Sequence, residues 1–395
     1  MRLYFSVGEP SGDQHAAMLI QELKKHVPHL ECEGLGGPHM KAAGCKLFYE
    51  LTTLAVMGIL KVLPLIGKFL SVGLTARKHF RTNPPDAVVL IDFPGFNRWI
   101  AWFAKGAGIP VYYYLPPQLW AWGPWRVKSL QQNVDRILSG LQFEVDWYEK
   151  NQLKAEFVGH PFFDEVAEHK LDEDWMQQQR ADGKRIMAIL PGSRSAEVTN
   201  NFPMMLDIVS ELSQKHPDVK FLVGNYKPTQ KEWCEIAFQR SDYAHSKRAI
   251  PLEFHTGKTS EIIELAECAY MVSGSISLEL LARKTPAVIQ YIAPWTMYQL
   301  AKLFLTCEYM TLPNLMAGRM IFPEFGLHGR PDGDRDAIAA QLKEWLSETE
   351  KMDDMLNQMD ELLAKVGQTG SCETTARAIL SDLNLLTIQP LTDAA

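Results

Sequence analysis

Short apolar runs alternate with longer helical stretches along the first 165 residues. Five of these runs have the length and the composition of buried strands, and they lie near residues 3–7, 31–35, 87–91, 111–115 and 136–139. Helical stretches, such as residues 15–25, separate most of them. This alternation predicts a parallel sheet covered by helices.

The second half of the chain repeats the pattern, with strands predicted near residues 185–190, 219–223, 269–272 and 287–291 and a helix over 277–282. Residues 164–184 are polar and rich in acids and glutamines, so we place the domain boundary there. The chain is therefore expected to be an α/β protein with Rossmann-like domains at 1–165 and 166–345. Residues 334–385 predict helices alone, and the segment 346–395 is expected to pack back on the first domain.

Both halves contain an apolar strand that leads into a Gly/Ser-rich turn. The first turn is Gly8-Glu-Pro-Ser-Gly-Asp13, and the second is Pro191-Gly-Ser-Arg194. Two such units predict two doubly wound parallel sheets that face one another across a cleft. Only the second turn carries a cation. It is the better anion site, because helix N-terminal amides and a guanidinium both favour phosphate.

The composition is that of an ordinary globular protein, with 46% hydrophobic and 22% charged residues among 395. A net charge of −7 argues against a general nucleic-acid binder. The six cysteines are scattered without any C-x-x-C pair, so we expect reduced thiols and a cytoplasmic protein. The pattern predicts neither a signal peptide nor a membrane-spanning helix.

Residues 54–81 depart from this composition, because they combine large apolar residues with several lysines and arginines. No acid occurs between Glu50 and Asp86. The pattern is typical of a helix that lies in a membrane interface, and it also fits a buried helix pair with solvated basic ends, which base rates favour. Pro64 and Gly67 interrupt the stretch and disfavour a spanning helix.

Two features of the first domain suggest chemistry at the carboxyl edge of its sheet. Asp92 follows the strand 87–91, where it can serve as a general base or as a simple turn former. Trp120 and Trp122 stand beside two prolines after the next strand and suit sugar rings or acyl chains, or packing between domains. Arg126 follows as a nearby cation.

In the second domain, Ser273-Gly-Ser275 comes directly after an apolar strand. Small residues allow backbone amides to approach a diphosphate, and Glu279, one helical turn later, can accept both hydroxyls of a ribose. A Gly-Ser helix start is weak on its own and stronger when joined with Arg194, since both turns are expected to open onto one crevice.

No metal or cofactor is expected. The sequence lacks metal-ligand spacing, a phosphate-binding G-x-x-x-x-G-K-[ST] loop and the G-x-G-x-x-G pattern of dehydrogenases. His15 and His160 flank the predicted cleft, but a lone histidine is more often structural than catalytic.

A series of short motifs resembles the lipid-A-disaccharide synthase family, and their order is also the family's. The resemblance runs from the first strand to about Phe325. The motifs are Gly8-Glu-Pro-Ser-Gly-Asp13, Gly36-Gly-Pro38, Ala55-Val-Met-Gly-Ile59, Ile91-Asp92 with Pro94 and Phe96-Asn97, Trp120-Ala-Trp122, Gly159-His160, Leu190-Pro-Gly-Ser-Arg194 with Ala196-Glu-Val198, and Leu312-Pro-Asn-Leu315 with Ala317-Gly-Arg319.

The resemblance implies a GT-B glycosyltransferase of family 19, inverting and metal-independent. It implies transfer from UDP-2,3-diacylglucosamine to 2,3-diacylglucosamine 1-phosphate (lipid X), giving the β-1,6-linked disaccharide 1-phosphate of lipid A biosynthesis and UDP. The alternatives are another GT-B enzyme on UDP-GlcNAc, either a lipid-linked transferase or a 2-epimerase, and a non-catalytic nucleotide-binding protein.

The resemblance also assigns roles to residues, with Asp92 as the base and Arg194 as the cation at the leaving diphosphate. The residues expected at UDP or the donor are Ser193, Ser273, Gly274, Ser275, Glu279 and Asn314, and those expected on the acceptor or sugar side are Glu9, Ser11, Gly12, Trp120 and Arg126. Asn314 is expected to meet a phosphate or a sugar hydroxyl.

The chain departs from the family pattern near the predicted base and after Trp122. Gly95 replaces a second acid, which leaves Asp92 as the base candidate, and Pro10 replaces a small residue. Gly123-Pro-Trp125 replaces a more basic stretch, which leaves Arg126 as the nearest cation for the acceptor phosphate.

Acylated substrates imply a protein bound peripherally to the cytoplasmic side of the inner membrane. Membrane and acyl contacts are then expected from Val56, Met57, Ile59 and Leu60. A homodimer is expected by analogy.

Overall fold

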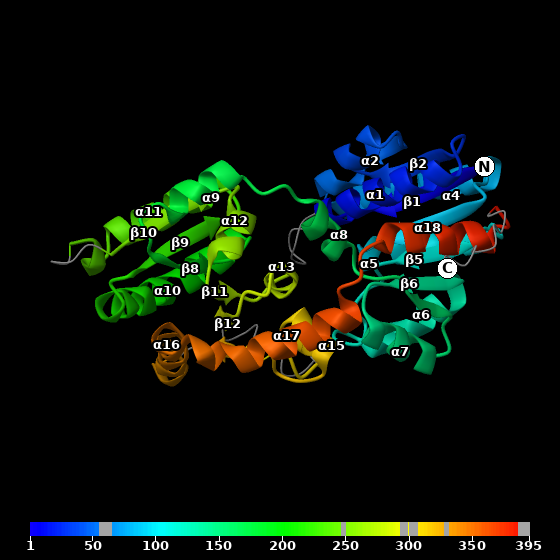
Figure 1. Ribbon diagram of the computed structural model, residues 1–395. Coiled ribbons are helices and arrows are strands. Elements are labelled where there is room, and N and C mark those ends of the chain that lie inside the picture. Colours follow the sequence, from blue (N-terminus) through cyan, green and yellow to red (C-terminus); the bar gives the residue numbers. More distant parts are fainter. Residues whose placement is uncertain (55–64, 246–249, 293–298, 300–306, 328–331, 386–395) are drawn as a thin grey trace. The chain divides into compact units, whose positions relative to one another are not determined.

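A computed structural model describes residues 1–54, 65–245, 250–292, 299, 307–327 and 332–385 (Figure 1). The chain divides into two compact units. Unit 1 comprises Met1–Asp164 and the chain from Gln368 onward, and unit 2 is Glu165–Gly367. Each unit is built on its own parallel sheet, which confirms the α/β class.

Unit 1 contains a seven-stranded sheet in the order β3-β2-β1-β4-β5-β6-β7. Its strands are β1 (Arg2–Val7), β2 (Glu31–Gly36), β3 (Lys46–Glu50), β4 (Ala87–Ile91), β5 (Val111–Tyr114), β6 (Arg136–Ser139) and β7 (Ala155–Phe157). The strand order reverses between β1 and β4, whose last residues Val7 and Ile91 pair with each other. Ligands bind at such a switch point in doubly wound folds.

Helices cover both faces of this sheet. They are α1 (Pro10–His26), α2 (Pro38–Ala42), α4 (Ile66–Thr82), α5 (Pro94–Lys105), α6 (Val127–Asn133), α7 (Gln142–Lys150), α8 (Pro161–Glu168) and α18 (Ser371–Asp382). Alternate residues of β1 serve the two faces: Phe5 packs in a core with α1 and α18, while Tyr4 packs in a second core with α4 and α5.

The sheet of unit 2 has six strands in the order β10-β9-β8-β11-β12-β13. They are β8 (Arg185–Leu190), β9 (Val219–Asn225), β10 (Leu252–Thr256), β11 (Cys268–Val272), β12 (Ala287–Ile292) and β13 (Glu324–Leu327). Here the order reverses between β8 and β11, where Leu190 pairs with Met271. Each half of the chain therefore presents one switch point.

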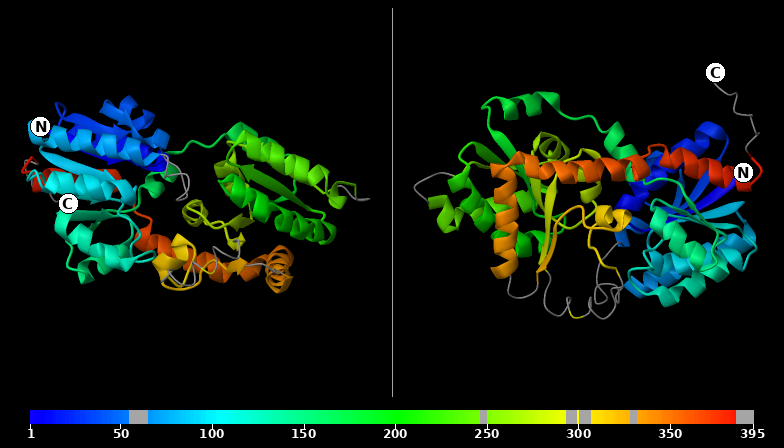
Figure 2. Two further views of the ribbon diagram at one scale, coloured as in Figure 1. Left: turned by 180° about the vertical axis from the view of Figure 1, so that it is seen from behind. Right: turned by 60° about the horizontal axis from the view of Figure 1, so that its bottom comes forward.

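The helices of unit 2 include the long C-terminal pair. They are α9 (Glu173–Arg180), α10 (Ser195–Lys215), α11 (Pro228–Gln239), α12 (Thr259–Leu265), α13 (Ser277–Ala282), α15 (Leu312–Ala317), α16 (Asp332–Ser347) and α17 (Asp353–Val366). Short 3-10 turns occur at Leu51–Leu54, Pro124–Arg126, Asp242–His245 and Thr349–Met352. The helices α16 and α17, orange in Figure 2, meet at a steep angle.

The chain returns to unit 1 later than the expected residue 346. Helix α16 packs on α10, β12 and β13, and α17 packs on α13 and α15, so both belong to unit 2. Buried Trp345 and Met359 anchor them there. The returning element is α18, which packs along α1. Asp164 secures it by accepting hydrogen bonds from the amides of Gly370 (2.5 Å) and Ser371 (2.9 Å).

The six cysteines, all among the described residues, form no disulfide, and five of them are buried. Among the described helices, none has both the length and the hydropathy needed to cross a bilayer.

Candidate active site

Asp92 lies at the switch point of unit 1, directly after the pair formed by Val7 and Ile91. Its φ is 47°, and Phe93 also has a φ of 47°. Left-handed backbone is uncommon outside glycine and costs on the order of 1–3 kcal/mol per residue, so two such residues in succession mark a strained turn. Strain of this kind is retained where the surrounding structure holds it in place.

Hydrogen bonds from Asn97 and Tyr113 hold this turn in place. The buried Asn97 amide donates to the carbonyl oxygens of Asp92 (2.8 Å), Ile91 (3.1 Å) and Ser6 (3.1 Å), and it accepts from the Ser6 hydroxyl at 2.6 Å. The Tyr113 hydroxyl donates to the Asp92 carbonyl at 2.7 Å. These bonds fix the Asp92 backbone and hence the direction of its side chain. The asparagine that ends the Pro94–Asn97 motif therefore has a positioning role.

The Asp92 carboxyl is half-buried and electrostatically perturbed. Burial, and after it the charge of Glu9, raise its pKa to about 7, while His15 acts in the opposite direction. Gly12 brings α1 close to it, because a Cβ on Gly12 would lie 3.2 Å from Asp92 Oδ2. A carboxyl that titrates near neutral pH is well matched to general-base catalysis.

The first turn of the chain adjoins this carboxyl. Helix α1 begins at Pro10 with Glu9 as its N-cap, so Ser11 and Gly12 lie in its first turn, and Glu9 and Ser11 are exposed. Asp13 has a structural role, since its carboxylate accepts bonds from the amides of Gly37, His39 and Met40 at 2.8–3.1 Å. The structure thus brings Glu9, Gly12 and Asp92 together.

Trp120 is held by a buried acid that sequence reasoning missed. Its indole N–H donates to Glu144 Oε1 at 2.7 Å, and the Ser139 hydroxyl donates to Glu144 Oε2 at 2.6 Å. The pKa of Glu144 is raised to about 7, mainly by burial and in small part by the charge of Asp92, against the lowering effect of those two hydrogen bonds. Trp120 also packs edge-on against Phe143, with ring centroids 4.8 Å apart. Only the three-dimensional pairing of α7 with the loop after β5 reveals this role.

The remaining predicted groups of unit 1 differ in exposure. Arg126 is exposed and donates to the Trp122 carbonyl, while Trp122 itself is 44% exposed. Burial lowers the pKa of His160 to about 3, and His15 contributes to that shift, so His160 stays neutral. Its Nδ1 accepts the Phe162 amide at 3.2 Å, which indicates a structural role.

In unit 2 the Glu197 carboxylate binds the Pro191–Arg194 turn. Glu197 Oε2 accepts from the amides of Ser193 and Arg194, each at 3.1 Å, and Glu197 Oε1 accepts from Arg194 Nη1 at 2.5 Å. Gly192 has a φ of +112°, which lets the turn close around the Glu197 side chain. The expectation that the Ser193 amide is open to a diphosphate is therefore wrong for this structure.

Arg194 itself remains available. Its side chain is 60% exposed, and a guanidinium has five N–H donors, of which Glu197 takes one. The turn thus presents a cation at the carboxyl end of β8, next to the end of β11.

The Ser273–Ser275 turn follows β11 at the same edge. Gly274 and Ser275 are exposed, and the Ser273 hydroxyl donates to the Met310 carbonyl at 3.4 Å. Glu279 is buried and pairs with Arg283 Nε at 3.0 Å, so the expected ribose-binding carboxylate already has a charged partner.

The Asn314 prediction is wrong about its side chain. The amide nitrogen donates to the Phe322 carbonyl (2.8 Å) and to Glu324 Oε1 (2.7 Å), and the oxygen accepts from the amides of Ile321 (2.7 Å) and Phe322 (2.9 Å). These four bonds use the full capacity of a fully buried amide, which leaves none for a substrate. Asn314 fastens the loop that leads into β13.

The predicted membrane contacts Val56, Met57, Ile59 and Leu60 lie outside the described residues. Helix α4, which begins just after them, exposes Ile66, Leu70 and Leu74 by 44%, 59% and 56%. Spacing of four residues places these three side chains on one face of the helix. Among the described residues, no group of His, Cys, Asp or Glu side chains is arranged to hold a metal ion.

Solved structures with a similar fold include a complex with UDP and a glycotransferase. The S. aureus MnaA co-structure with UDP has a TM-score of 0.64 at 12% identity and covers 98% of both chains. The kitacinnamycin glycotransferase has a TM-score of 0.60 at 15% identity and covers 96% of this chain and 98% of its own. At these identities the likeness shows the fold alone, which is that of GT-B enzymes.

Sequence comparison is more specific. The lipid-A-disaccharide synthase of Geobacter sulfurreducens is 31% identical over 386 residues, with 97% of both chains covered. That of Aeromonas hydrophila is 34% identical over 332 residues, covering 83% of this chain and 86% of its own. The model of the lipid-A-disaccharide synthetase family matches residues 3–381, from β1 through both switch points into α18. Since that match includes the Asp92 turn and the Arg194 turn, the chain belongs to the lipid-A-disaccharide synthetase family and is a glycosyltransferase of lipid A biosynthesis.

Proposed function

We propose that the protein transfers 2,3-diacylglucosamine from its UDP derivative to 2,3-diacylglucosamine 1-phosphate (lipid X). The products are the β-1,6-linked disaccharide 1-phosphate and UDP. Family membership supports this substrate pair. The observation that carries the proposal is the state of Asp92. Its turn is strained and held by hydrogen bonds, and the pKa of its carboxyl is raised to about 7.

In the proposed reaction, Asp92 takes the proton of the acceptor 6-hydroxyl. As the O–H bond breaks, the oxygen forms a bond to the anomeric carbon of the donor, and the bond from that carbon to the UDP oxygen breaks. Attack from the face opposite UDP inverts the anomeric configuration and gives the β-linkage. Burial makes the Asp92 carboxylate a stronger base than an exposed aspartate, while a pKa near 7 keeps a large fraction ionised at neutral pH.

The leaving diphosphate is assigned to the Arg194 turn. Arg194 is the exposed cation at the carboxyl edge of the second sheet, and the Ser273–Ser275 turn follows the neighbouring strand. A guanidinium stabilises charge that builds on the departing phosphate, so the proposed mechanism requires no metal ion or other cofactor. Because Glu197 holds Arg194 at 2.5 Å, the diphosphate would compete with Glu197 for that cation.

Acylated substrates also require contact with a membrane, and we propose peripheral binding to the inner membrane from the cytoplasmic side. The exposed apolar face of α4 supports this proposal. Exchanging Leu70 and Leu74 for serine is expected to reduce association with anionic liposomes while leaving UDP affinity unchanged. Unchanged liposome association would reject this role for α4.

The function is tested by UDP release from UDP-2,3-diacylglucosamine with and without lipid X. A transferase releases UDP only when the acceptor is present, and the disaccharide 1-phosphate appears in equal amount. Release that is independent of the acceptor, or conversion of UDP-GlcNAc without release of UDP, would contradict the proposal and favour a hydrolase or an epimerase.

A further inference from the structure

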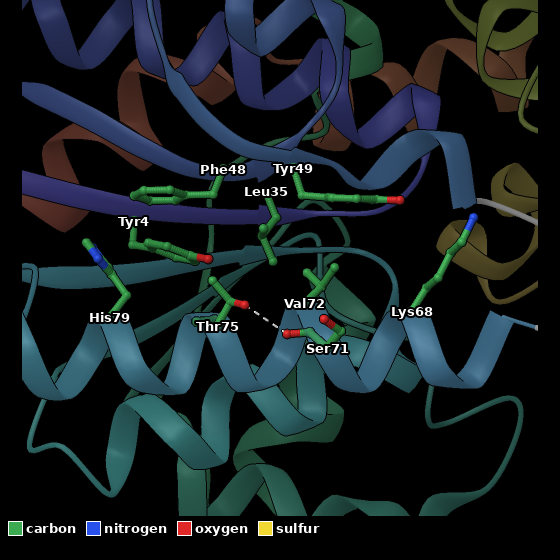
Figure 3. A pocket seen from close by; sticks show the side chains of 10 residues that line it. Tyr4, Leu35, Phe48, Tyr49, Lys68, Ser71, Val72, Thr75 and His79 are labelled. Carbon is green, nitrogen blue, oxygen red and sulfur yellow. Dashed lines mark hydrogen bonds between the residues drawn. The ribbon is translucent and has the colours of Figure 1, made fainter.

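Unit 1 contains a hollow that the proposed chemistry does not use. It has a volume of about 310 Å³ and lies between α4 and the strands β1, β2 and β3 (Figure 3). This volume is at the lower end of small-molecule sites. We refer to this hollow, lined by Tyr4, Leu35, Phe48, Val72, Thr75 and their neighbours, as the α4 groove.

The lining of the α4 groove is mainly apolar and aromatic. Tyr4 and Phe48 stack with centroids 6.1 Å apart, and the hydroxyl of Thr75 donates to the Ser71 carbonyl of its own helix at 2.9 Å. His79 Nε2 lies 2.6 Å from Glu33 Oε1, so these polar groups are paired with each other. The rest of the lining is mostly apolar or aromatic, with the hydroxyls of Tyr4, Tyr49 and Ser71 as further polar groups, and a hydrocarbon suits it best.

The groove is long enough for a lipid chain. Figure 3 shows Lys68 and His79 at opposite ends of the row of lining side chains. Both lie on α4, so the 1.5 Å rise per residue gives a length of about 16 Å between them. One leaflet of bilayer hydrocarbon is about 15 Å thick, half of the full core.

The end of the groove at Lys68 adjoins the Asp92 turn. Phe69, the next residue, packs against Phe93 and Phe96 with ring centroids 5.9 Å and 5.7 Å apart. Phe93 in turn directly follows Asp92 in the strained turn. Lys68 is exposed, and its ammonium suits the carbonyl and phosphate oxygens of an acylated sugar phosphate. The groove thus ends beside the turn that carries the proposed base.

We infer that the α4 groove binds one fatty acyl chain of the acceptor, with the sugar at Asp92 and the chain running along α4 toward His79. This inference rests on the proposed function for the identity of the acceptor, but the affinity of the groove for an acyl chain can be measured without it. Each methylene removed from water favours binding, so a chain in the groove adds to the affinity for the acceptor.

The test uses cis-parinaric acid, a fluorescent long-chain fatty acid, titrated into the full-length protein. Thr75→Trp places an indole in the groove, and Thr82→Trp adds the same bulk at an exposed position of the same helix that is not part of the lining. We expect saturable binding to the wild type, at least tenfold weaker binding to Thr75→Trp, and unchanged binding to Thr82→Trp. Hydrogen exchange of peptides from β1 and β4 serves as the check that unit 1 of both variants is folded.

Equal binding of the fatty acid to the wild type and Thr75→Trp, or no saturable binding to the wild type, would overturn the inference. In transfer assays, Thr75→Trp is expected to raise the KM for lipid X at least tenfold and to leave the KM for the donor unchanged. Saturable binding of the fatty acid without acceptor-dependent UDP release would contradict the proposed function but support the groove as an acyl site. Normal transfer by a protein whose groove does not bind the fatty acid would contradict the groove assignment but support the proposed function.

Discussion

The raised pKa of Asp92 predicts that this residue lowers the stability of unit 1. Replacing it with asparagine keeps the size of the side chain and a residue type that tolerates left-handed backbone, but removes the charge. The folded protein binds the Asp92 proton more tightly than the unfolded chain does, because the pKa rises from 3.8 to about 7 on folding. Ionisation therefore costs stability at any pH above 3.8.

The size of this cost follows from the shift. A shift of about three units corresponds to about 4 kcal/mol at 1.36 kcal/mol per unit. The cost is absent below pH 3.8, reaches about 1.6 kcal/mol at pH 5, and is complete above pH 7. These figures are upper limits, since part of the Asp92 side chain remains in contact with water.

Asp92→Asn is therefore expected to be more stable than the wild type at pH 8, and its advantage is expected to shrink by about 2 kcal/mol at pH 5. Urea-dependent hydrogen exchange of peptides from β1 and β4 measures the free energy of opening within unit 1, which is necessary because two units need not unfold together. Asp146→Asn, at an exposed position on α7, is the matched control and should show no such trend. An Asp92→Asn advantage that is absent, or that does not grow with pH, would refute this reasoning.

Three further predictions follow from the same contacts. Glu9→Gln is expected to shift the acidic limb of kcat/KM to lower pH, because the Glu9 charge raises the pKa of Asp92; an unchanged profile measured from pH 5 to 8 would contradict this. Glu197→Gln keeps an oxygen that accepts from the turn amides but removes the negative charge that holds Arg194. UDP binding, measured by calorimetry, is therefore expected to become several-fold tighter. Weaker binding would contradict this and would mean that Glu197 positions Arg194 for the phosphate. Asn314→Ala leaves the buried amides of Ile321 and Phe322 without a hydrogen-bond acceptor, which costs about 3 kcal/mol of folding stability. The melting temperature should therefore fall while kcat/KM stays within a few-fold of the wild type. A raised KM for the donor at unchanged stability would instead indicate that Asn314 binds the substrate.

Most of the fold could be predicted from the sequence because the buried strands carry a strong apolar signal. The predicted strands at 87–91, 136–139 and 185–190 coincide with β4, β6 and β8. The strands that the sequence did not indicate are β3, β7, β10 and β13. β3 and β10 mix charged and apolar residues at or near sheet edges, and β7 has three residues. Edge strands need not be apolar on both faces, so their pattern resembles that of a loop.

The site was predictable where chemistry depends on position along one strand, and not where it depends on a partner elsewhere in the chain. Asp92 and Arg194 follow from strand ends alone. The sequence could not show that Glu197 accepts a hydrogen bond from the Ser193 amide, or that Glu144 accepts one from the Trp120 indole, since these are side-chain contacts. Nor could it separate an asparagine that binds ligand from one, such as Asn314, whose four bonds are all internal.

The strain in the Asp92 turn fits this division. A fold under no functional constraint would place glycine, asparagine or aspartate at a φ of 47°, whereas this chain places Phe93 there directly after Asp92 and uses Asn97 and Tyr113 to hold the turn. The local rule is broken at Phe93, next to the residue proposed to carry the chemistry, as expected when function competes with stability.

The central claim is that Asp92 is the base of an acceptor-dependent transfer, and Asp92→Ala tests it most directly. Turnover is measured as UDP release from UDP-2,3-diacylglucosamine in the presence of lipid X, and UDP affinity is measured on the same preparation by calorimetry. General-base catalysis contributes on the order of 10²–10⁴-fold, so turnover should fall by at least about a hundredfold while the Kd for UDP stays within about twofold. Near-normal turnover at unchanged UDP affinity would contradict the account.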